Sequence, residues 1–521
     1  MVLAERLLLV LAVLLGYGAL CLWQFRRGSR GRAQSVDSSV SAASMLVAYA
    51  SQSGVALALA QRSAKALQAI GPVRVLPLNR VDDAVLAGTE HAFFVASTYG
   101  EGEPPDNGNR FARRYLNGSS AQFSHLKFSV LALGDSAYQH FCAFGHKLHE
   151  GLSSHGAAPV FAPLELDGNA TGNVDAVLQR WYQQLAHFGA ESSLPDLIEL
   201  SFQRNHYQSW HLDSRKVVNV GSVGEPLVHL KFSPAQVLGD VALDTLWQAG
   251  DIAEVLPRNS VIRCAEFAAK YKLDFEAGLS IDGKACRLID ELQRRALPVS
   301  DIAGPVVGDL DSLSAWVTSL PLLAKREYSI ASVPEDGSLD LLVRLQGRDG
   351  TPGVASHWLG RHLAIDDSVA LRVRRNPLFH APESNIPVIF IGNGSGFAGI
   401  RAHLRARQLS NRKDNWLMFG ERSPRADRVF SDEIAEWQDH GYLPHIDLTF
   451  SRCREQPAYV QDAILANVAD LKAWLSAGAA IYVCGSREGM AAGVDRQLRR
   501  VLGDQQLDDL ADAGLYCRDV Y

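Results

Sequence analysis

The chain has 521 residues, of which 47% are hydrophobic and 21% charged, and its formal net charge is -6. One hydrophobic core rarely organises this length, so two or three domains are expected. The negative charge gives no support for nucleic-acid binding, which calls for a basic surface. The 7 cysteines show no close pairing, so we predict neither a disulfide framework nor a metal site, and a reducing compartment is favoured.

An uncharged apolar segment occupies residues 7–25 and would extend about 28 Å as a helix, close to the ~30 Å hydrocarbon core of a bilayer. Arg26, Arg27, Arg30 and Arg32 follow it, whereas only Arg6 lies just before it. This asymmetry predicts a single-pass membrane anchor over residues 1–28 with the bulk of the chain in the cytoplasm. A cleaved signal peptide is the alternative, but its charge normally precedes the apolar run. Residues 29–44, rich in small residues, predict a flexible tether.

From residue 45 to 188, short apolar runs alternate with helix-length amphipathic segments. Strands are expected at residues 45–50, 92–97 and 128–133, and helices at 55–68 and 173–188. The alternation predicts a doubly wound parallel sheet with helices on both faces. Ligands of such sheets bind beyond the carboxyl ends of the strands.

Each of the three predicted strands ends in a loop with side chains suited to a flavin. The loop residues are Ser51, Gln52, Ser53, Gly54, Val55 and Ala56 in the first, Ser97, Thr98, Tyr99 and Gly100 in the second, and Leu133, Gly134, Asp135, Ser136, Tyr138, Phe141 and Cys142 in the third. The first opens a helix and could cradle a phosphate, whereas the others offer aromatic rings. Any one loop is also typical of a plain strand-to-helix turn. The three in this order predict an FMN site.

After residue 188 the alternation of short apolar runs with amphipathic segments ends. Residues 189–210 are expected to form a linker, and residues 211–385 a small antiparallel barrel with strands at 216–223, 226–232 and 250–256. Residues 258–325 form an insert. Beyond it, Arg326, Glu327, Tyr328 and Ser329 alternate along a β-prone run, which suits either a cofactor seat or an ordinary barrel strand. Gly353, Val354, Ala355 and Ser356 open a further short helix.

Residues 386–521 predict a second doubly wound sheet, with strands at 387–392, 415–419 and 480–484 and a helix at 399–408. The first strand runs into a glycine-rich turn that contains Gly392, Gly394 and Ser395. A strand, a glycine-rich turn and a helix N-terminus are the parts of a dinucleotide pyrophosphate site.

Taken together, these motifs resemble the diflavin reductase family, which includes the sulfite reductase flavoprotein and the microsomal reductases that feed haem monooxygenases. The resemblance covers nearly everything from Met45 to Tyr521. It implies an α/β protein with a flavodoxin-like FMN domain, an antiparallel β-barrel FAD domain with a shortened helical insert, and a ferredoxin-reductase-like NADP domain. The implied cofactors are FMN, FAD and NADPH.

The resemblance also assigns flavin-binding roles to individual residues. The first loop would hold the FMN phosphate, Tyr99 and Tyr138 would flank the ring, and Asp167 would lie near it. At the FAD site, Arg326 would meet the pyrophosphate, Tyr328 would pack on the ring or ribitol, and Ser329 would lie near the reactive nitrogen. The four residues from Gly353 to Ser356 would receive the FAD pyrophosphate as well.

The last domain receives its roles in the same way. The residues expected to contact the phosphates of NADPH, besides the glycine-rich turn, are Arg401, Arg422, Ser451, Arg452, Tyr459 and Gln461. Ser329, Cys484 and Asp519 would surround the atoms that exchange the hydride, and Tyr521 would cover the FAD ring. For Cys484 the alternative is an inert buried thiol.

The chain departs from the family pattern at several positions. Val55 replaces a polar residue of the phosphate loop, and Glu327 replaces a bulkier residue. Pro457 replaces a lysine, and Ser486 and Gly493 replace acids near the nicotinamide end. The insert has about half the length expected from ordinary domain sizes.

We therefore predict a membrane-anchored oxidoreductase that carries electrons from NADPH through FAD and FMN to an acceptor protein, such as a haem or iron–sulfur protein. Two alternatives remain: a flavoprotein subunit active only in a sulfite-reductase-like complex, and a flavin-binding membrane sensor or scaffold. Glu101, Glu103 and Asp106 could form an acidic docking face, or they could simply be solvated.

Overall fold

The computed structural model describes most of the chain from residue 45 onward. The described residues are 45–51, 54–98, 102–116, 122–136, 140–168, 174–188, 207–235, 246–281, 283–300, 302–306, 309–348, 350–382, 384–453 and 458–521. The predicted anchor and tether lie outside them, as does most of the predicted linker. No helix within these ranges combines the length and the apolar character needed to cross a bilayer.

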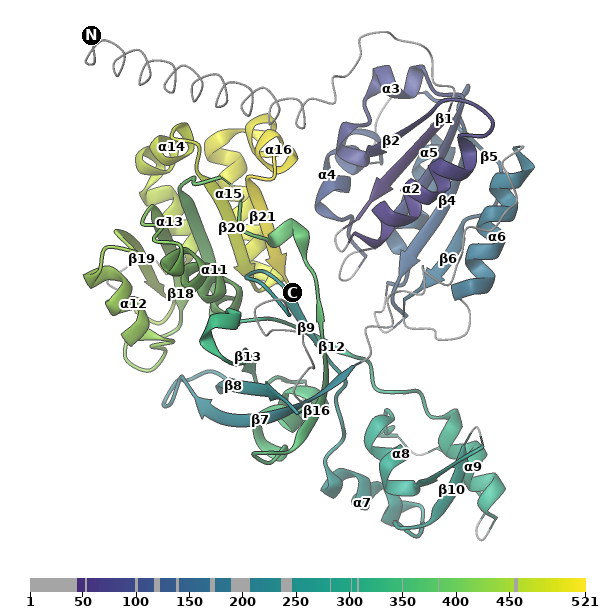
Figure 1. The fold of residues 1–521 in the computed structure, drawn as a ribbon, viewed down its shortest axis with the longest axis vertical. Coiled ribbons are helices and arrows are strands. Elements are labelled where there is room, and N and C mark those ends of the chain that lie inside the picture. Colours follow the sequence, from purple (N-terminus) through teal and green to yellow (C-terminus); the bar gives the residue numbers. More distant parts are fainter. Residues whose placement is uncertain are drawn as a thin grey trace, which may run out of the picture.

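The first domain is a parallel sheet covered by helices on both faces (Figure 1). Its strand order is β2-β1-β3-β4, and β5 and β6 both pair with β4. Phe93 and Phe94 are neighbours on β3 and enter separate cores, because successive strand side chains face opposite sides. The strands are β1 (Met45–Ala50), β2 (Val73–Pro77), β3 (His91–Ser97), β4 (Lys127–Gly134), β5 (Ala158–Pro159) and β6 (Leu164–Asp167), and the helices are α2 (Val55–Leu67), α3 (Asp83–Ala87), α4 (Asn109–Phe111), α5 (Ala143–Ser154) and α6 (Val174–His187). The three predicted strands and both predicted helices are confirmed to within one residue at each end.

The second domain is a six-stranded antiparallel sheet in the order β12-β9-β16-β7-β8-β13. A bridge between Ile330 and Leu341 joins its first and last strands, so the sheet closes into a barrel. The strands are β7 (Gln208–Val217), β8 (Leu227–Pro234), β9 (Ile252–Val255), β12 (Arg326–Ser329), β13 (Leu339–Arg344) and β16 (Ser368–Arg374). Between β13 and β16 lie the hairpin β14 (Gly347–Arg348) and β15 (Thr351–Pro352), and helix α10 (Val354–His357).

The strand predicted at residues 216–223 is wrong. The strand β7 begins earlier, inside the predicted linker, and ends at Val217, after which the chain turns. Asn219 holds this turn, since its amide donates to the Glu225 carbonyl (3.1 Å) and its carbonyl accepts from the Leu227 N–H (2.6 Å). Gly221 takes a positive φ of 80° there, so these backbone groups cannot continue the sheet. The strands predicted at 226–232 and 250–256 are confirmed as β8 and β9.

The insert forms a small unit with its own core, apart from the barrel in Figure 1. Its elements are α7 (Val261–Lys270), the hairpin of β10 (Gly278–Ile281) and β11 (Lys284–Arg287), α8 (Leu288–Arg294) and α9 (Leu310–Ser319). Phe267 stacks on Trp316 at 5.9 Å and ties α7 to α9. The expected helical insert therefore also contains a β-hairpin.

The last domain is a parallel sheet in the order β19-β18-β17-β20-β21. Its strands are β17 (Val388–Asn393), β18 (Asn415–Glu421), β19 (His445–Phe450), β20 (Ala480–Gly485) and β21 (Tyr516–Val520). Its helices are α11 (Phe397–Leu409), α12 (Ser431–Asp439), α13 (Val460–Ala466), α14 (Val468–Ser476), α15 (Ala492–Leu502) and α16 (Asp504–Asp512). The predicted strands and the predicted helix at 399–408 are confirmed, and the glycine-rich turn joins β17 to α11.

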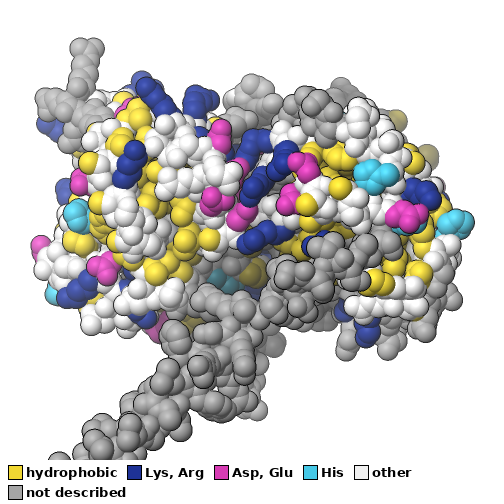
Figure 2. All heavy atoms as spheres, turned by 90° about the horizontal axis from the view of Figure 1, so that it is seen from above, with side chains coloured by type: hydrophobic (Ala, Val, Ile, Leu, Met, Phe, Trp, Pro, Cys, Tyr) yellow, Lys and Arg dark blue, Asp and Glu magenta, His cyan; other side chains and the backbone are white. Residues whose placement is uncertain are grey.

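The first and last domains meet through charged side chains. Arg110 pairs with Asp512 (2.9 Å), and Arg113 pairs with Asp508 of the same helix, α16 (2.6 Å). Asp106 pairs with Arg518 of β21. Figure 2 views the molecule from above and shows basic and acidic side chains mixed along the middle of that view, where the two domains adjoin. We call these three ion pairs the docking lattice.

Candidate active site

The two described ends of the first loop, Ser51 and Gly54, lie at the N-terminus of α2. The Ser51 hydroxyl accepts a hydrogen bond from the Gly54 N–H (2.9 Å), and the Ser51 N–H donates to the Asn107 side chain (3.0 Å). Gly54 has a φ of 84°, and a Cβ added there would meet nothing within 4 Å. Open space at a helix N-terminus suits a phosphate. Val55 and Ala56 begin the helix, and the apolar Val55 side chain adds no hydrogen-bond donor to the loop.

The second and third loops lie beside the first, because β1, β3 and β4 are adjacent in the sheet. The Thr98 hydroxyl accepts from the Phe144 N–H (3.2 Å), and Asp167 accepts from the Ser136 N–H (3.1 Å). Asp167 therefore shapes the third loop. The structure brings together Ser97, Thr98, Leu133, Gly134, Asp135, Ser136 and Asp167 at this edge of the sheet.

Cys142 does not face this edge. Its side chain is fully buried and its thiol donates to the Ala132 carbonyl (3.4 Å). A Cβ on Gly134 would lie 2.7 Å from the Cys142 nitrogen, so Gly134 permits this close packing. Burial raises the pKa of the thiol to about 12. Cys142 thus supports the loop from beneath, and Phe141 is half-buried beside it. Gln52, Ser53, Tyr99, Gly100 and Tyr138 lie outside the described residues.

The stretch Arg326 to Ser329 is strand β12 and distributes its side chains over two faces. Tyr328 packs on the barrel core. Arg326 is exposed, and among the described residues its guanidinium donates only to the backbone carbonyls of Ala324 (3.3 Å) and Lys325 (3.0 Å). An exposed guanidinium of this kind has donors to spare for a pyrophosphate. Ser329, one residue after Tyr328, is buried on the opposite face.

Glu327 has its own cations in this structure. Its carboxylate accepts from Arg374 (2.9 Å) and lies 3.4 Å from the Lys325 ammonium. The fully buried Glu254 carboxylate also pairs with Arg372, Arg374 and Lys325, and these cations lower its pKa to about 2 despite its burial. Glu327, which departs from the family pattern, is thus part of a cluster of ion pairs at strand β12. Arg374 is a residue that the sequence analysis missed, since its role depends on partners from distant strands.

Gly353 lies beside a hollow of about 320 Å³, lined among others by Arg263, Gln346, Thr351 and Val354. A Cβ on Gly353 would come within 2.7 Å of the Gln346 carbonyl oxygen, so only glycine fits this approach. The Ser356 hydroxyl accepts from the Gln346 N–H (3.1 Å) and fixes the loop, and Ala355 is buried. Arg263, on the insert, was also missed, because the sequence does not place α7 against this loop.

Ser329, Cys484 and Asp519 meet at the junction of the barrel and the last domain. The Ser329 hydroxyl donates to the Asp519 carboxylate (2.5 Å), and the Cys484 sulfur lies 3.8 Å from the same oxygen and 4.0 Å from the Ser329 oxygen. The three residues come from β12, β20 and β21, and all three are buried. Strand pairing places Cys484 directly opposite Asp519. The sequence prediction that these three residues gather is matched by their positions.

Burial sets the charge of this cluster. It raises the pKa of Asp519 above that of an ordinary carboxyl, although the Ser329 hydrogen bond opposes the shift. Burial and the neighbouring Asp519 raise the pKa of the Cys484 thiol well above its usual value. The thiol therefore stays protonated at neutral pH and acts as a donor. Tyr521 lies beside the cluster, half exposed, and its hydroxyl is 3.1 Å from the Ser395 oxygen.

The glycine-rich turn packs tightly against the end of β20. Cβ atoms on Gly392 and Gly396 would stand 2.7 and 2.1 Å from the Cys484 carbonyl oxygen. Glycine at these positions brings the turn and the N-terminus of α11 next to the cluster around Asp519. Gly394 takes a φ of 53° and faces the Arg344 guanidinium. A dinucleotide pyrophosphate would lie at this turn with its reactive end toward Asp519.

The residues expected to recognise a 2′-phosphate lie together at the ends of β18 and β19. The Ser451 N–H donates to the Glu421 carbonyl (2.9 Å), and the Arg452 N–H donates to the Arg422 carbonyl (2.8 Å). Arg452 and Tyr459 are exposed, and Arg422 is half-buried against Gly224. Gln461 fills the space that Gly493 leaves, since a Cβ there would come within 3.2 Å of it. Pro457 lies outside the described residues.

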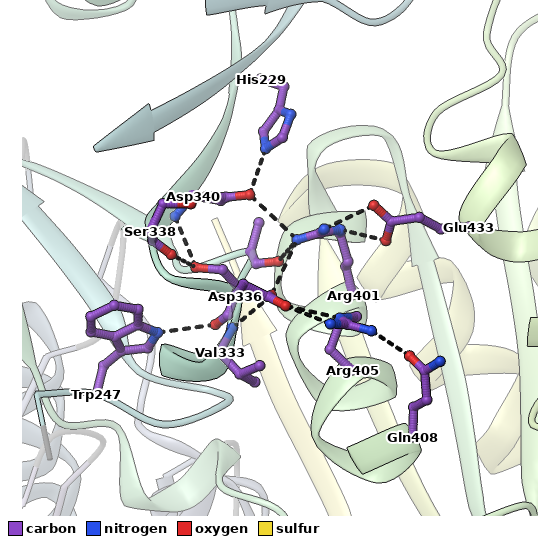
Figure 3. A network of polar contacts seen from close by, with 12 residues as sticks. His229, Trp247, Val333, Asp336, Ser338, Asp340, Arg401, Arg405, Gln408 and Glu433 are labelled. Atoms are coloured by element: carbon purple, nitrogen blue, oxygen red, sulfur yellow. Dashed lines mark hydrogen bonds and ion pairs between the residues drawn. The ribbon is translucent and has the colours of Figure 1, made fainter. Parts of the chain in front are cut away.

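Arg401 does not join this phosphate cluster. Its side chain is buried, and its guanidinium donates to both oxygens of Glu433 (2.8 Å each) and to the Ala331 carbonyl (2.6 Å). It also lies 3.5 Å from Asp340 of the barrel (Figure 3). These partners come from two domains, so Arg401 ties α11 to α12 and the barrel. The predicted phosphate contact would require these pairs to break, and the structure favours an interdomain structural role.

Comparison with known proteins agrees with this architecture. The family model described as Flavodoxin matches residues 47–181, and the model described as Oxidoreductase NAD-binding domain matches residues 390–496. The chain is 28% identical to the sulfite reductase (NADPH) flavoprotein alpha-component of Aliivibrio fischeri, over 94% of this chain and 91% of that protein. It is likewise 28% identical to the proteins of that name from Bacillus subtilis, over 91% of this chain and 89% of that protein, and from Vibrio cholerae, over 94% and 89%. The two matched domains and these relatives support a diflavin reductase, an NADPH-dependent oxidoreductase that binds FAD and FMN.

Proposed function

We propose that this protein carries electrons from NADPH through FAD and FMN to an acceptor protein at a membrane. The observation that supports it best is the buried group of Ser329, Cys484 and Asp519 beside Tyr521, where the barrel meets the glycine-rich turn. The bound cofactors supply the redox chemistry, a two-electron transfer between NADPH and FAD and single-electron transfers through FMN.

The side chains of this group favour hydride transfer by their charges and donors. Positive charge develops on a nicotinamide ring as it gives up a hydride, and the Asp519 carboxylate can stabilise that charge at close range. Because Asp519 is buried, little water screens this attraction. Ser329 and Cys484 donate toward the same carboxylate and fix its orientation.

Tyr521 and the glycine-rich turn decide access to this group. The Tyr521 ring stands at the turn through its hydroxyl contact with Ser395. Its half-exposed position leaves room for it to move aside when a nicotinamide ring enters. The turn then holds the pyrophosphate near the N-terminus of α11, which lies against the end of β20.

The flavin loops of the first domain would release electrons to the acceptor. Their edge of the sheet carries the phosphate cradle at Ser51 and Gly54. We propose that the apolar segment 7–25 anchors the protein in a membrane, with residues 45–521 in the cytoplasm, and that the acceptor lies at that membrane. The support is the charge asymmetry around this segment in the sequence.

Reduction of ferricyanide by the full chain, purified in detergent with both flavins bound, tests the electron path. We expect steady turnover with NADPH, and Cys484→Ala should slow it about tenfold or more, because alanine has no donor for Asp519. The matched control is Cys264→Ala, since that thiol is buried in the insert. No turnover by a chain that holds both flavins would contradict the proposal and favour a sensor or scaffold.

A second candidate is a flavoprotein subunit that acts only within a larger enzyme, since its relatives are named as an alpha-component. The two functions differ in their dependence on a partner. A chain that reduces ferricyanide but reduces no membrane acceptor until a second polypeptide is added would favour the subunit. Membrane association itself is tested by fractionating cells that express the full chain, and recovery in the soluble fraction would contradict the anchor.

A further inference from the structure

Arg344 connects three parts of the nucleotide site. It ends β13 of the barrel, and its Nη1 atom donates to the Glu225 carbonyl (3.0 Å) in the turn before β8. Its Nη2 atom lies 3.0 Å from the place where a Cβ of Gly394 would stand, and 3.6 Å from Oε1 of Glu421. The guanidinium is therefore laid against the backbone of the glycine-rich turn, with Glu421 behind it.

Glu421 is a buried carboxylate without its full set of hydrogen bonds. It ends β18, and its side chain is only 4% exposed. Among the described residues, nothing donates a hydrogen bond to Oε1, since the 3.6 Å contact with Arg344 is too long for one. Buried acceptors are nearly always hydrogen-bonded, so an unmet one beside a ligand site needs an explanation.

The charged groups around Glu421 come from three places. Arg344 faces it from β13, Arg422 follows it in the chain, and Asp427 lies in the loop after β18. Burial and the Asp427 charge raise the pKa of Glu421 to about 7, while the two arginines oppose the rise and the charge of Arg344 is the largest single opposing cause. The ionised form of Glu421 near neutral pH thus depends on Arg344.

A pyrophosphate at the glycine-rich turn would compete for Arg344. The turn opens α11, a helix of 13 residues, and backbone N–H groups and the helix dipole favour an anion there. An arginine forms two parallel hydrogen bonds to a phosphate, whereas it makes none to Glu421 here. The exchange is therefore favourable for Arg344 and leaves Glu421 without its main counter-charge.

We propose that Arg344 moves from Glu421 to the pyrophosphate when NADPH binds, and that Glu421 then takes up one proton from solvent. This inference rests on the proposed function, because it assumes a dinucleotide at the glycine-rich turn. Arg344 touches the nucleotide, and Glu421 is a positioning residue that acts through it. By linkage, the affinity for the nucleotide falls as pH rises above about 7, since ionised Glu421 holds Arg344 back.

Calorimetric titration of NADP⁺ into the flavin-loaded full chain tests the proposal. Runs at pH 7.5 in two buffers with different ionisation enthalpies give the number of protons taken up. We expect the wild type to take up more protons than Glu421→Gln, which has no group to protonate at this position. The 2′-phosphate of NADP⁺ also titrates, but its contribution is the same in both proteins and cancels in the difference. The matched control is Glu436→Gln, an exposed glutamate of the same domain, which should behave as the wild type.

The pH dependence of the dissociation constant gives a second measurement. Between pH 6.5 and 8.5 the wild type should lose about sixfold in affinity relative to Glu421→Gln, as expected if nucleotide binding raises the pKa of Glu421 by about one unit. Arg344→Lys should reduce the proton uptake, because lysine cannot form the paired hydrogen bonds. If Glu421→Gln does not fold, the proton uptake of Arg344→Lys provides the comparison with the wild type.

Three results would overturn the proposal. Equal proton uptake in the wild type and Glu421→Gln would exclude the exchange. Weaker binding by Glu421→Gln at every pH would mean that the carboxylate itself contacts the nucleotide. No binding of NADP⁺ to the wild type would overturn the proposed function as well, whereas either of the first two results with normal ferricyanide reduction would leave that function intact.

Discussion

Neutralising two aspartates of α16, in the double variant Asp508→Asn with Asp512→Asn, is expected to loosen the contact between the first and last domains. Arg113 and Arg110 would each lose a partner now at 2.6 and 2.9 Å. The aspartate side chains are only 15% and 13% exposed, whereas the arginines are 40% and 34% exposed. Such partly exposed pairs contribute about 0.5–1 kcal/mol each, so the double variant should favour separation by about 1–2 kcal/mol, or roughly five- to thirtyfold.

Small-angle scattering of the full chain and stopped-flow transfer between the flavins are the assays. The radius of gyration should rise in the double variant, and the wild type should expand in the same way as salt increases toward 1 M, where the Debye length is about 3 Å. Transfer between the flavins should slow in parallel. The control is Asp290→Asn, which removes an exposed pair with Arg287 inside the insert. A wild type that stays compact in 1 M salt would show that the docking lattice does not hold the domains together.

Four further outcomes follow, and they concern Asp519, Tyr521 and Arg401. Hydride transfer from NADPH to the bound FAD should become faster as pH rises, because burial raises the pKa of Asp519 and the carboxyl ionises only at higher pH. Single-turnover absorbance measurements should show slow transfer at every pH in Asp519→Asn. The same raised pKa means that stability falls as pH rises through the ionisation of Asp519, so Asp519→Asn should melt no lower than the wild type at neutral pH. Tyr521→Ala should narrow the preference for NADPH over NADH in steady-state kinetics, and an unchanged ratio would refute the gating role. Arg401→Met should lower the melting temperature while the KM for NADPH changes little, since Arg401 pairs with Glu433; a raised KM with normal stability would restore the predicted phosphate contact.

The architecture was predictable because its strongest signals are local. The continuous apolar run of β3, which includes Phe93 and Phe94, is typical of a strand buried on both faces, and its alternation with amphipathic segments predicts a doubly wound sheet. The failed strand at residues 216–223 shows the limit of the same argument. Valines favour strands, but Asn219 and Gly221 make a turn through hydrogen bonds that a hydrophobic pattern does not reveal.

The resemblance predicted part of the candidate site correctly. It failed where the role of a residue depends on contacts with residues far away in the sequence. The resemblance to the diflavin reductases implied that Ser329, Cys484 and Asp519 lie together, and the structure places them within 4.0 Å of one another. The same resemblance implied that Arg401 contacts a phosphate, but acids far from it in the sequence neutralise it. Nothing in the local sequence pairs Arg344 with Glu421, which are 77 positions apart by their numbering and come from different domains.

Strand β21 gives the docking lattice and the hydride site a common support. Successive residues of a strand face opposite sides, so Arg518 points toward Asp106 of the first domain while Asp519 points toward Ser329. Cys484 pairs with Asp519 across the sheet, so β20 shares this geometry. A shift of β21 when the first domain separates would therefore also move the carboxylate that stabilises the nicotinamide charge. Docking and hydride transfer are then coupled through one strand, and a variant of Arg518 should alter both rates together.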